Sequence, residues 1–407
     1  MVPYRSWLRS SSLAGLVLAL PALAVEVPAG TEIQVRLQTR IASNTSKAGD
    51  PVDLTVIAPV AVNGAAAIPA GVTLHGVVKD ATAATDPGVR ATLGLDFREL
   101  EMGGQRVRVQ AQLTAVENAR ESVDDKGEIQ GILTNETLSS RMDSGIGKVS
   151  GRLSTIGGFL EAAKGAVFKE TAGDIAYDPG VEMDLKLTAP LKLSGTTAPG
   201  PDASLEPVAD RPALADLVNR QPFQSRAQKP PKESDITTLM FIGSQEQLQG
   251  AFHDAGWSQA AKLGEKSKIE TLRAIVEDRG YSEAPVSILY LDGRPPDLVF
   301  EKLNNTFSKR HHLRIWLRPD TYRGQPVWVC AATHDTGIDF SAKDRTFIHK
   351  IDSQIDAERS KVVNDLLLTG KVRSLAMVER PNVPQHGMNA TGDKLETDAR
   401  MAVLILK

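Results

Sequence analysis

The sequence has almost no cysteine and no excess of either charge. Cys330 is the only cysteine in 407 residues, which excludes an internal disulfide framework and any zinc site built from several thiolates. Basic and acidic residues nearly balance, at 47 and 50, so the net charge of −3 provides no field that would hold nucleic acid. We therefore predict no nucleic-acid binding, and we expect packed cores to provide the stability. Cys330 stands in an apolar strand pattern and is predicted to be a small buried residue.

Long apolar runs are also scarce, and the one that stands out is at the N-terminus. Arg5 and Arg9 precede an apolar run over residues 13–23, and Ala22-Leu23-Ala24 has the small-x-small pattern of a signal-peptidase site. The run is shorter than the roughly 20 apolar residues of a membrane-spanning helix, and no later segment is long enough either. The pattern predicts a signal peptide over residues 1–24, with no transmembrane helix after cleavage. We expect a periplasmic or secreted protein of the cell envelope.

Alternating apolar and polar residues predict β-strands over residues 25–193. The alternation begins at Ile33, Val35 and Leu37 and recurs over residues 52–56, 72–78, 91–97, 107–113 and 181–187. Short alternating strands separated by Gly, Pro, Asn and Asp are typical of an antiparallel barrel or sandwich. Within this domain, a Gly- and Ser-rich stretch over about residues 118–173 has apolar residues three and four apart, which predicts a helical insertion.

A five-residue phrase occurs twice in this region. Residues 27–31, Val-Pro-Ala-Gly-Thr, return as Ile-Pro-Ala-Gly-Val at residues 68–72. Proline sets the first turn position and glycine accepts a positive φ, so both phrases predict a tight turn that leads into a strand.

The composition changes after residue 193. Residues 194–234 are rich in Pro, Ala, Ser and charge, which predicts an extended, disordered linker, with a short helix over residues 212–220 as an option. Residues 235–407 are predicted to form an α+β layered domain. Its predicted helices cover residues 245–256, 267–280 and 352–369, and its predicted strands cover residues 236–242, 286–291, 298–303, 313–317, 327–331, 372–378 and 401–406.

Short sequence phrases in each of the two domains resemble those of a known family. Residues 310–316 (RHHLRIW), 332–335 (ATHD) and 349–352 (HKID) occur in the order seen in the LssY C-terminal domain family, so residues 235–378 resemble that family. The resemblance supplies a boundary but implies no mechanism. Residues 25–193, with their two turn phrases, resemble the β-barrel of TrbI-type conjugation-channel proteins. That likeness implies a homo-oligomer assembled through the barrel.

Four of the seven histidines lie within forty residues of the C-terminal domain, beside several acids. Imidazole and carboxylate groups are suited to acid–base chemistry and to divalent metals. The candidate catalytic residues are His312, His334, Asp335, His349 and Asp352. His334, His349 and Asp352 are the candidate ligands of a divalent metal.

Strand alternation divides the two adjacent histidines between opposite faces. His312 shares one face with Arg314, and His311 shares the other with Leu313 and Ile315. Only one of them can join a given site, and we expect His311 to face the core and His312 to face the site. The competing interpretation is that these side chains are ordinary packing residues and that the acids cap the helix predicted from residue 352.

Two functional hypotheses remain open. The favoured one is an envelope binding or assembly module that contacts an envelope protein, glycan or lipid. The alternative is a metal- or His-dependent hydrolase that acts on an envelope phosphoester, lipid or glycan. No His-Glu-x-x-His or other ligand spacing is present, which favours the first hypothesis.

The signal peptide gives the first testable prediction. When the full-length chain is expressed and the cells are fractionated, the mature protein is expected in the periplasm with Val25 as its N-terminal residue. N-terminal sequencing checks this, and recovery of intact Met1 in the cytoplasm would contradict it.

Overall fold

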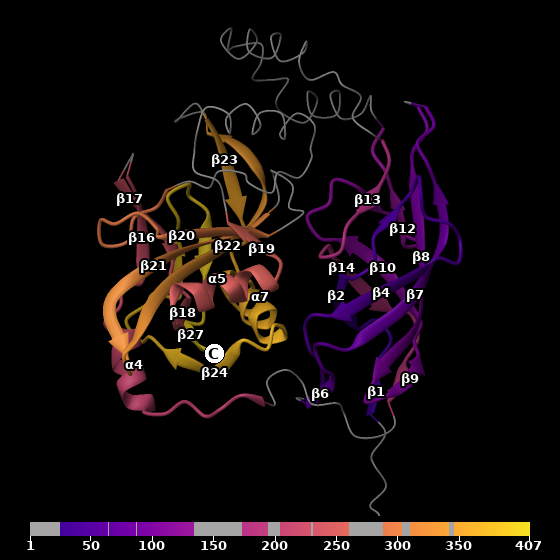
Figure 1. Cartoon of the computed structure of the whole chain (residues 1–407). Helices are drawn as coiled ribbons and strands as arrows, with labels where there is room; N and C mark the ends of the chain where they lie inside the picture. Colours follow the sequence, from indigo (N-terminus) through magenta and orange to yellow (C-terminus); the bar gives the residue numbers. More distant parts are fainter. Residues whose placement is uncertain are drawn as a thin grey trace, which may run out of the picture.

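The computed structural model describes residues 25–63, 65–86, 88–133, 173–193, 204–228, 231–259, 288–302, 310–341 and 346–407. These residues form two β-rich units, which Figure 1 shows side by side with α7 at the border between them. The predicted signal peptide over residues 1–24 lies outside the described residues. So do residues 134–172 of the predicted helical insertion and the helix predicted over residues 267–280.

The N-terminal unit is a nearly closed antiparallel barrel. Its main sheet has the order β10-β14-β2-β4-β7-β8-β12-β11, and β10 and β11 lie near each other at the seam. The strands of the unit are β1 Val25–Val27, β2 Glu32–Leu37, β3 Ile41–Ala42, β4 Pro51–Val56, β5 Val60–Val62, β6 Ala65–Ile68, β7 Thr73–Thr82, β8 Thr92–Met102, β9 Gln105–Arg108, β10 Ala111–Val116, β11 Ser122–Val123, β12 Glu128–Gln130, β13 Ala176–Tyr177, β14 Glu182–Leu187 and β15 Leu191–Leu193.

The alternation of apolar and polar residues predicted for these strands places their apolar side chains inside the barrel. Ile33, Val35 and Leu37 of β2 are buried in one core with the inward residues of the other strands. Both predicted turns are confirmed, because Gly30 and Gly71 have φ values of +86° and +89°, a backbone conformation that glycine adopts at little cost. Residues 118–133, which were predicted to begin the helical insertion, instead contain β11 and β12.

The C-terminal unit is a mixed sheet with few helices. The sheet order is β19-β20-β21-β22-β18-β27-β24, with β23 paired to β22, and β18 runs parallel to β27. Its elements are α4 Arg211–Asn219, β16 Gln224–Gln228, β17 Pro231–Ile236, β18 Leu239–Ile242, α5 Gln245–Asp254, β19 Trp257–Gln259, β20 Leu298–Lys302, β21 Arg310–Tyr322, β22 Gln325–Ser341, β23 Thr346–Ile351, α7 Ile355–Leu368, β24 Val372–Glu379, β25 His386–Met388, β26 Lys394–Glu396 and β27 Arg400–Leu406.

Both faces of the central strands are covered. α5 and α7 pack on one face around Phe252 and Leu366, and Cys330 is buried in the same core, as predicted. The opposite face is covered by α4, whose Leu214 and Leu217 are almost fully buried. Each side of the sheet therefore has its own apolar core.

The linker prediction was wrong for its second half. Residues 204–228 and 231–234 include α4, β16 and part of β17, all packed on the C-terminal sheet. The prediction rested on the high proline content of the segment. Three apolar residues of α4, at positions 214, 217 and 218, nevertheless lie on one helix face and bury enough area to order the segment. Pro212 suits this helix because the N–H it lacks would have had no partner in the first turn.

A buried charge network joins the two units. Arg36 of β2 and Glu182 of β14 lie 2.7 Å apart on the outer face of the barrel. Glu182 also pairs with Lys302, at 3.2 Å, and with Lys361 of α7. Asp365 of α7 pairs with Lys302 at 2.9 Å and with Arg36.

The network keeps its acids ionised. Burial raises the pKa of Glu182, but Lys302, Lys361 and Arg36 outweigh burial and hold that pKa well below its usual range. Asp365 also accepts a hydrogen bond from the indole N–H of Trp257 at 2.9 Å. The cations and anions are thus interleaved across the boundary, so each unit supplies counter-ions to the other.

Removing one acid tests this network. Glu182→Gln leaves three buried cations facing a single acid, and loss of a buried ion-pair partner costs about 3–5 kcal/mol. We expect a loss of that order in the free energy of unfolding, measured by urea denaturation. The control is Glu26→Gln, whose partner Lys192 is 4.0 Å away and exposed, and which should change stability by less than about 0.5 kcal/mol. Equal effects of the two substitutions would show that the network does not stabilise the boundary.

Candidate functional site

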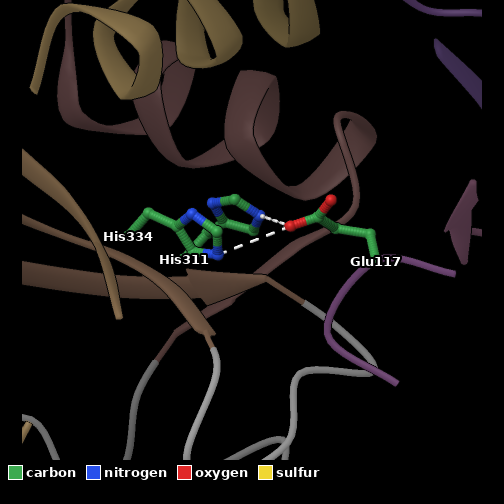
Figure 2. A group of neighbouring side chains, drawn as sticks. All are labelled: Glu117, His311 and His334. Atoms are coloured by element: carbon green, nitrogen blue, oxygen red, sulfur yellow. Dashed lines mark ion pairs between the residues drawn. The ribbon is translucent and has the colours of Figure 1, made fainter. Parts of the chain in front are cut away.

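Two histidines stack where the C-terminal sheet meets the barrel. His311 of β21 and His334 of β22 are register partners. Their ring centroids are 4.1 Å apart and the ring planes differ by 18°. Figure 2 shows both rings directed toward the same acid.

The acid comes from the barrel. Glu117 follows β10, and its backbone N–H donates to the carbonyl of Glu182. Oε1 of Glu117 lies 3.3 Å from Nε2 of His311 and 3.4 Å from Nε2 of His334, as the dashed lines in Figure 2 mark. The next residue, Asn118, has a φ of +55°, and its Oδ1 is 3.1 Å from Nε2 of His334. The turn after β10 therefore presents two oxygen atoms, which accept hydrogen bonds, to the histidine pair.

A second carboxylate orients His311 from the other side. Oε2 of Glu358, on α7, is 2.8 Å from Nδ1 of His311, and Glu358 is buried. This contact directs the Nε2 atom of His311 toward Glu117. Oε1 of Glu358 is buried and finds no hydrogen-bond donor among the residues that the structure describes.

The two histidines have opposite charge preferences. Burial lowers the pKa of His311, but Glu358 and Glu117 outweigh burial and raise it to about 9. Burial and the charge on His311 lower the pKa of His334. Burial raises the pKa of Glu117, and its interaction with His311 outweighs burial, so the net shift is downward. At neutral pH these pKa shifts favour an imidazolium at His311, held between two carboxylates, beside a neutral His334.

One further acid lies on the same surface. Asp184 of β14 points out of the barrel, next to the turn that carries Glu117. Burial, together with the charge of Glu117, raises the pKa of Asp184 to about 6. Its register partner Gln34 donates a hydrogen bond to it.

The alternation predicted for the paired histidines is confirmed, and His311 is buried on the sheet face that also carries Leu313 and Ile315. His312 lies on the opposite face of the sheet, where its Nε2 is 2.9 Å from the hydroxyl of Thr333. Asp335 is 3.6 Å from His312 and accepts a hydrogen bond from Arg310 at 3.1 Å. These side chains are buried in a polar cluster of the sheet, because this face is covered too. The candidates His312 and Asp335 are therefore not brought to the site that contains His334.

The remaining candidates lie near His334 in the backbone. The N–H of Asp352 donates to the carbonyl of His334, and its carboxylate accepts from the N–H of Gln354, the residue before α7. α7 itself begins without a side-chain cap. His349 lies in β23 opposite Ile338, and its side chain is outside what the structure describes. Of the three predicted metal ligands, His334 is the one that belongs to the cluster with Glu117 and His311.

Glu117, His311 and Glu358 were missed from the sequence. Glu117 lies about 200 residues from the histidines and in the other unit, so no local spacing could indicate it. Glu358 is an acid of the first turn of α7, as predicted, and its side chain is also buried against His311.

Comparison with known proteins finds a family resemblance in the C-terminal unit. Residues 219–401 match the family model described as LssY C-terminus. The resemblance predicted for residues 235–378 is thus confirmed, and the match to the LssY C-terminus extends beyond it at both ends. His311, His334 and Glu358 all lie within the LssY-like region, whereas Glu117 lies outside it.

The other comparisons add little. No curated protein matches the chain. Among solved structures, ComB10 of the Com Type IV secretion system of Helicobacter pylori matches at 11% sequence identity, with 42% of this chain and 91% of that chain covered and a TM-score of 0.23. Among the described residues, no helix has the length and apolar character needed to cross a membrane.

The charge state of His311 gives a prediction for the metal-free protein. Its pKa in the folded protein, about 9, exceeds the ordinary value of 6.5. The stabilisation is therefore fully present below pH 6.5 and is lost as pH rises through about 9. We expect the free energy of unfolding, measured by urea denaturation with a chelator present, to fall between pH 6.5 and pH 9. His311→Ala should fall less over the same interval, and an equal fall would contradict the pairing.

Proposed function

We propose that this chain is an exported envelope protein that binds a divalent cation between its two units, with Glu117, His311 and His334 as ligands. The observation that carries the proposal is the convergence of these three donors, whose ligand atoms all lie within 4.8 Å of one another. Two imidazoles and one carboxylate are a common donor set for zinc and other first-row metals.

The spacing suits a metal ion. Donors held about 2.1 Å from a tetrahedral ion are separated from each other by about 3.4 Å. The distances from Glu117 Oε1 to the two imidazole nitrogens are 3.3 and 3.4 Å. A cation could take the place of the proton on Nε2 of His311. The two stacked rings, whose planes differ by 18°, would have to turn so that both Nε2 lone pairs point at it.

The surroundings of His311 also suit a ligand. Metal-binding histidines commonly donate their second N–H to a carboxylate, which fixes the ring and raises its basicity. Glu358 is placed to accept that N–H from Nδ1 of His311. Its second oxygen, Oε1, is buried and finds no donor among the described residues, so it leaves Glu358 free to accept from His311.

A cation held in this way supports the binding or assembly hypothesis. The barrel contributes Glu117 and the LssY-like region contributes the histidines, so a bound ion would strengthen the contact between the units. Export rests on the N-terminal sequence pattern, and the contact with an envelope protein, glycan or lipid remains part of the proposal.

Metal titration of the mature chain, residues 25–407, tests this function. Zn²⁺ or Mn²⁺ should raise the melting temperature, because a hundredfold excess over Kd adds about 2.7 kcal/mol to the stability of the folded state. Glu117→Gln and His334→Ala should each abolish the rise.

His75→Ala is the matched control for that titration. His75 is a barrel histidine with two carboxylates, Asp53 at 2.7 Å and Glu101 at 3.1 Å, but it lies outside the cluster. This variant should keep the metal-dependent rise. A rise that survives in Glu117→Gln and disappears in His75→Ala would move the metal to the barrel surface and refute the proposal.

The affinity for the metal ion should increase as pH rises. A metal ligand must be deprotonated, and the pKa of His311 is about 9 without metal. Between pH 6.5 and pH 8, each unit of pH should therefore lower Kd about tenfold, because one proton leaves on binding. Isothermal titration calorimetry measures both Kd and the proton release, and a Kd that is constant above pH 6.5 would contradict the role of His311.

A further inference from the structure

A cavity of about 360 Å³ opens beside the three donors, between the barrel and α7. Its lining includes Glu117, His311 and His334, so an ion held by them would face the cavity. Three protein ligands leave coordination positions open, as in catalytic zinc sites. The cavity is large enough for a small organic group as well as water.

Asp184 lines the same cavity from the barrel side. Alternation along β14 buries Met183 and Leu185 in the barrel core and turns Asp184 outward, toward α7. Among the described residues, Asp184 has a hydrogen bond from Gln34 but no ion-pair partner. It is therefore an acid of the cavity that the charge network does not use.

The charge of the lining restricts the ligand. Besides Asp184, the carboxylates of Glu117, Glu182, Asp352 and Glu358 line the cavity, against one lysine, Lys361, which is already paired with Glu182. Even with a divalent cation present, carboxylates remain in excess. A phosphoester or another anion would be repelled, whereas a neutral group can approach the cation.

We propose that this cavity is a hydrolytic site for a neutral ester or amide, with Asp184 as the catalytic base; this inference rests on the proposed cation site. Asp184 accepts a proton from a water molecule in the cavity, and the water oxygen forms a bond to the carbonyl carbon. The bond from that carbon to the leaving oxygen or nitrogen then breaks, and Asp184 returns the proton to the leaving group. A divalent cation held by Glu117, His311 and His334 would supply positive charge for the carbonyl oxygen.

The experiment uses the mature chain loaded with Zn²⁺ and two probes, p-nitrophenyl acetate and p-nitrophenyl phosphate. The Glu117→Gln variant provides the baseline for reaction at other surface groups. We expect hydrolysis of the acetate above this baseline and none of the phosphate. Asp184→Asn should lower the rate about 100-fold or more, which is the usual contribution of a general base. It should keep the metal-dependent rise in melting temperature.

Two further variants sharpen the test. Asp184→Glu keeps a carboxylate and should recover part of the rate, whereas Asp125→Asn, which removes an exposed acid on the barrel surface, should leave the rate unchanged.

Each adverse outcome overturns a stated part of the proposal. If the metal-loaded chain shows the rise in melting temperature but no hydrolysis above the baseline, the cation site stands and the hydrolytic activity is refuted. Full activity in Asp184→Asn refutes the base, and loss of metal binding in that variant would make Asp184 a ligand instead. Faster hydrolysis of the phosphate than of the acetate refutes the neutral substrate.

Discussion

The pairing of Glu182 with cations from both units is the interaction on which the rest of the site depends. Burying a carboxylate costs several kcal/mol unless partners surround it, and here Arg36, Lys302 and Lys361 do so. These contacts bring the outer face of β14 against α7. The N–H of Glu117 donates a hydrogen bond to the carbonyl of Glu182. The contact between β14 and α7 therefore also places the turn after β10 beside the histidines. The charge network and the candidate site are consecutive parts of one boundary.

The stacking of His311 and His334 depends on an irregularity of the β21–β22 hairpin. The turn at residues 323 and 324 has positive φ at both positions, as in a tight hairpin. Counting regular pairs outward from this turn places Leu313 opposite His334. The register shifts between Leu317 and Thr321, where Pro319 interrupts the ladder, and the shift places His311 there instead. The strands could be predicted from the sequence, whereas the bulge that aligns the two histidines could not.

Predictions that depend on local sequence patterns agree with the structure better than those that depend on contacts between distant residues. Periodicity identified β2, β4, β7, β14, α5 and α7 to within a few residues, because each of these elements buries an apolar face of its own. The strand predicted over residues 107–113 is divided between β9 and β10. The expectation that His312 faces the site assumed one polar face, whereas both faces of this sheet are covered. Residues 204–234 were assigned by their proline content, although α4 has the apolar spacing of a packed helix. Glu117 and Glu358 depend on contacts between distant parts of the chain, which no local pattern records.

The division of the donors between two units has a thermodynamic consequence. Neither unit alone holds the full set of proposed ligands, so the free energy of binding a cation there would also be free energy of association of the units. The imidazolium of His311 partly substitutes for a cation, since it already bridges Glu117 and Glu358 across the boundary. Metal binding would replace the single positive charge of the His311 imidazolium with the two charges of a divalent cation. Because carboxylates are in excess there, the additional positive charge favours binding of the ion. A partner that separated the barrel from the LssY-like region would, by the same linkage, release the cation.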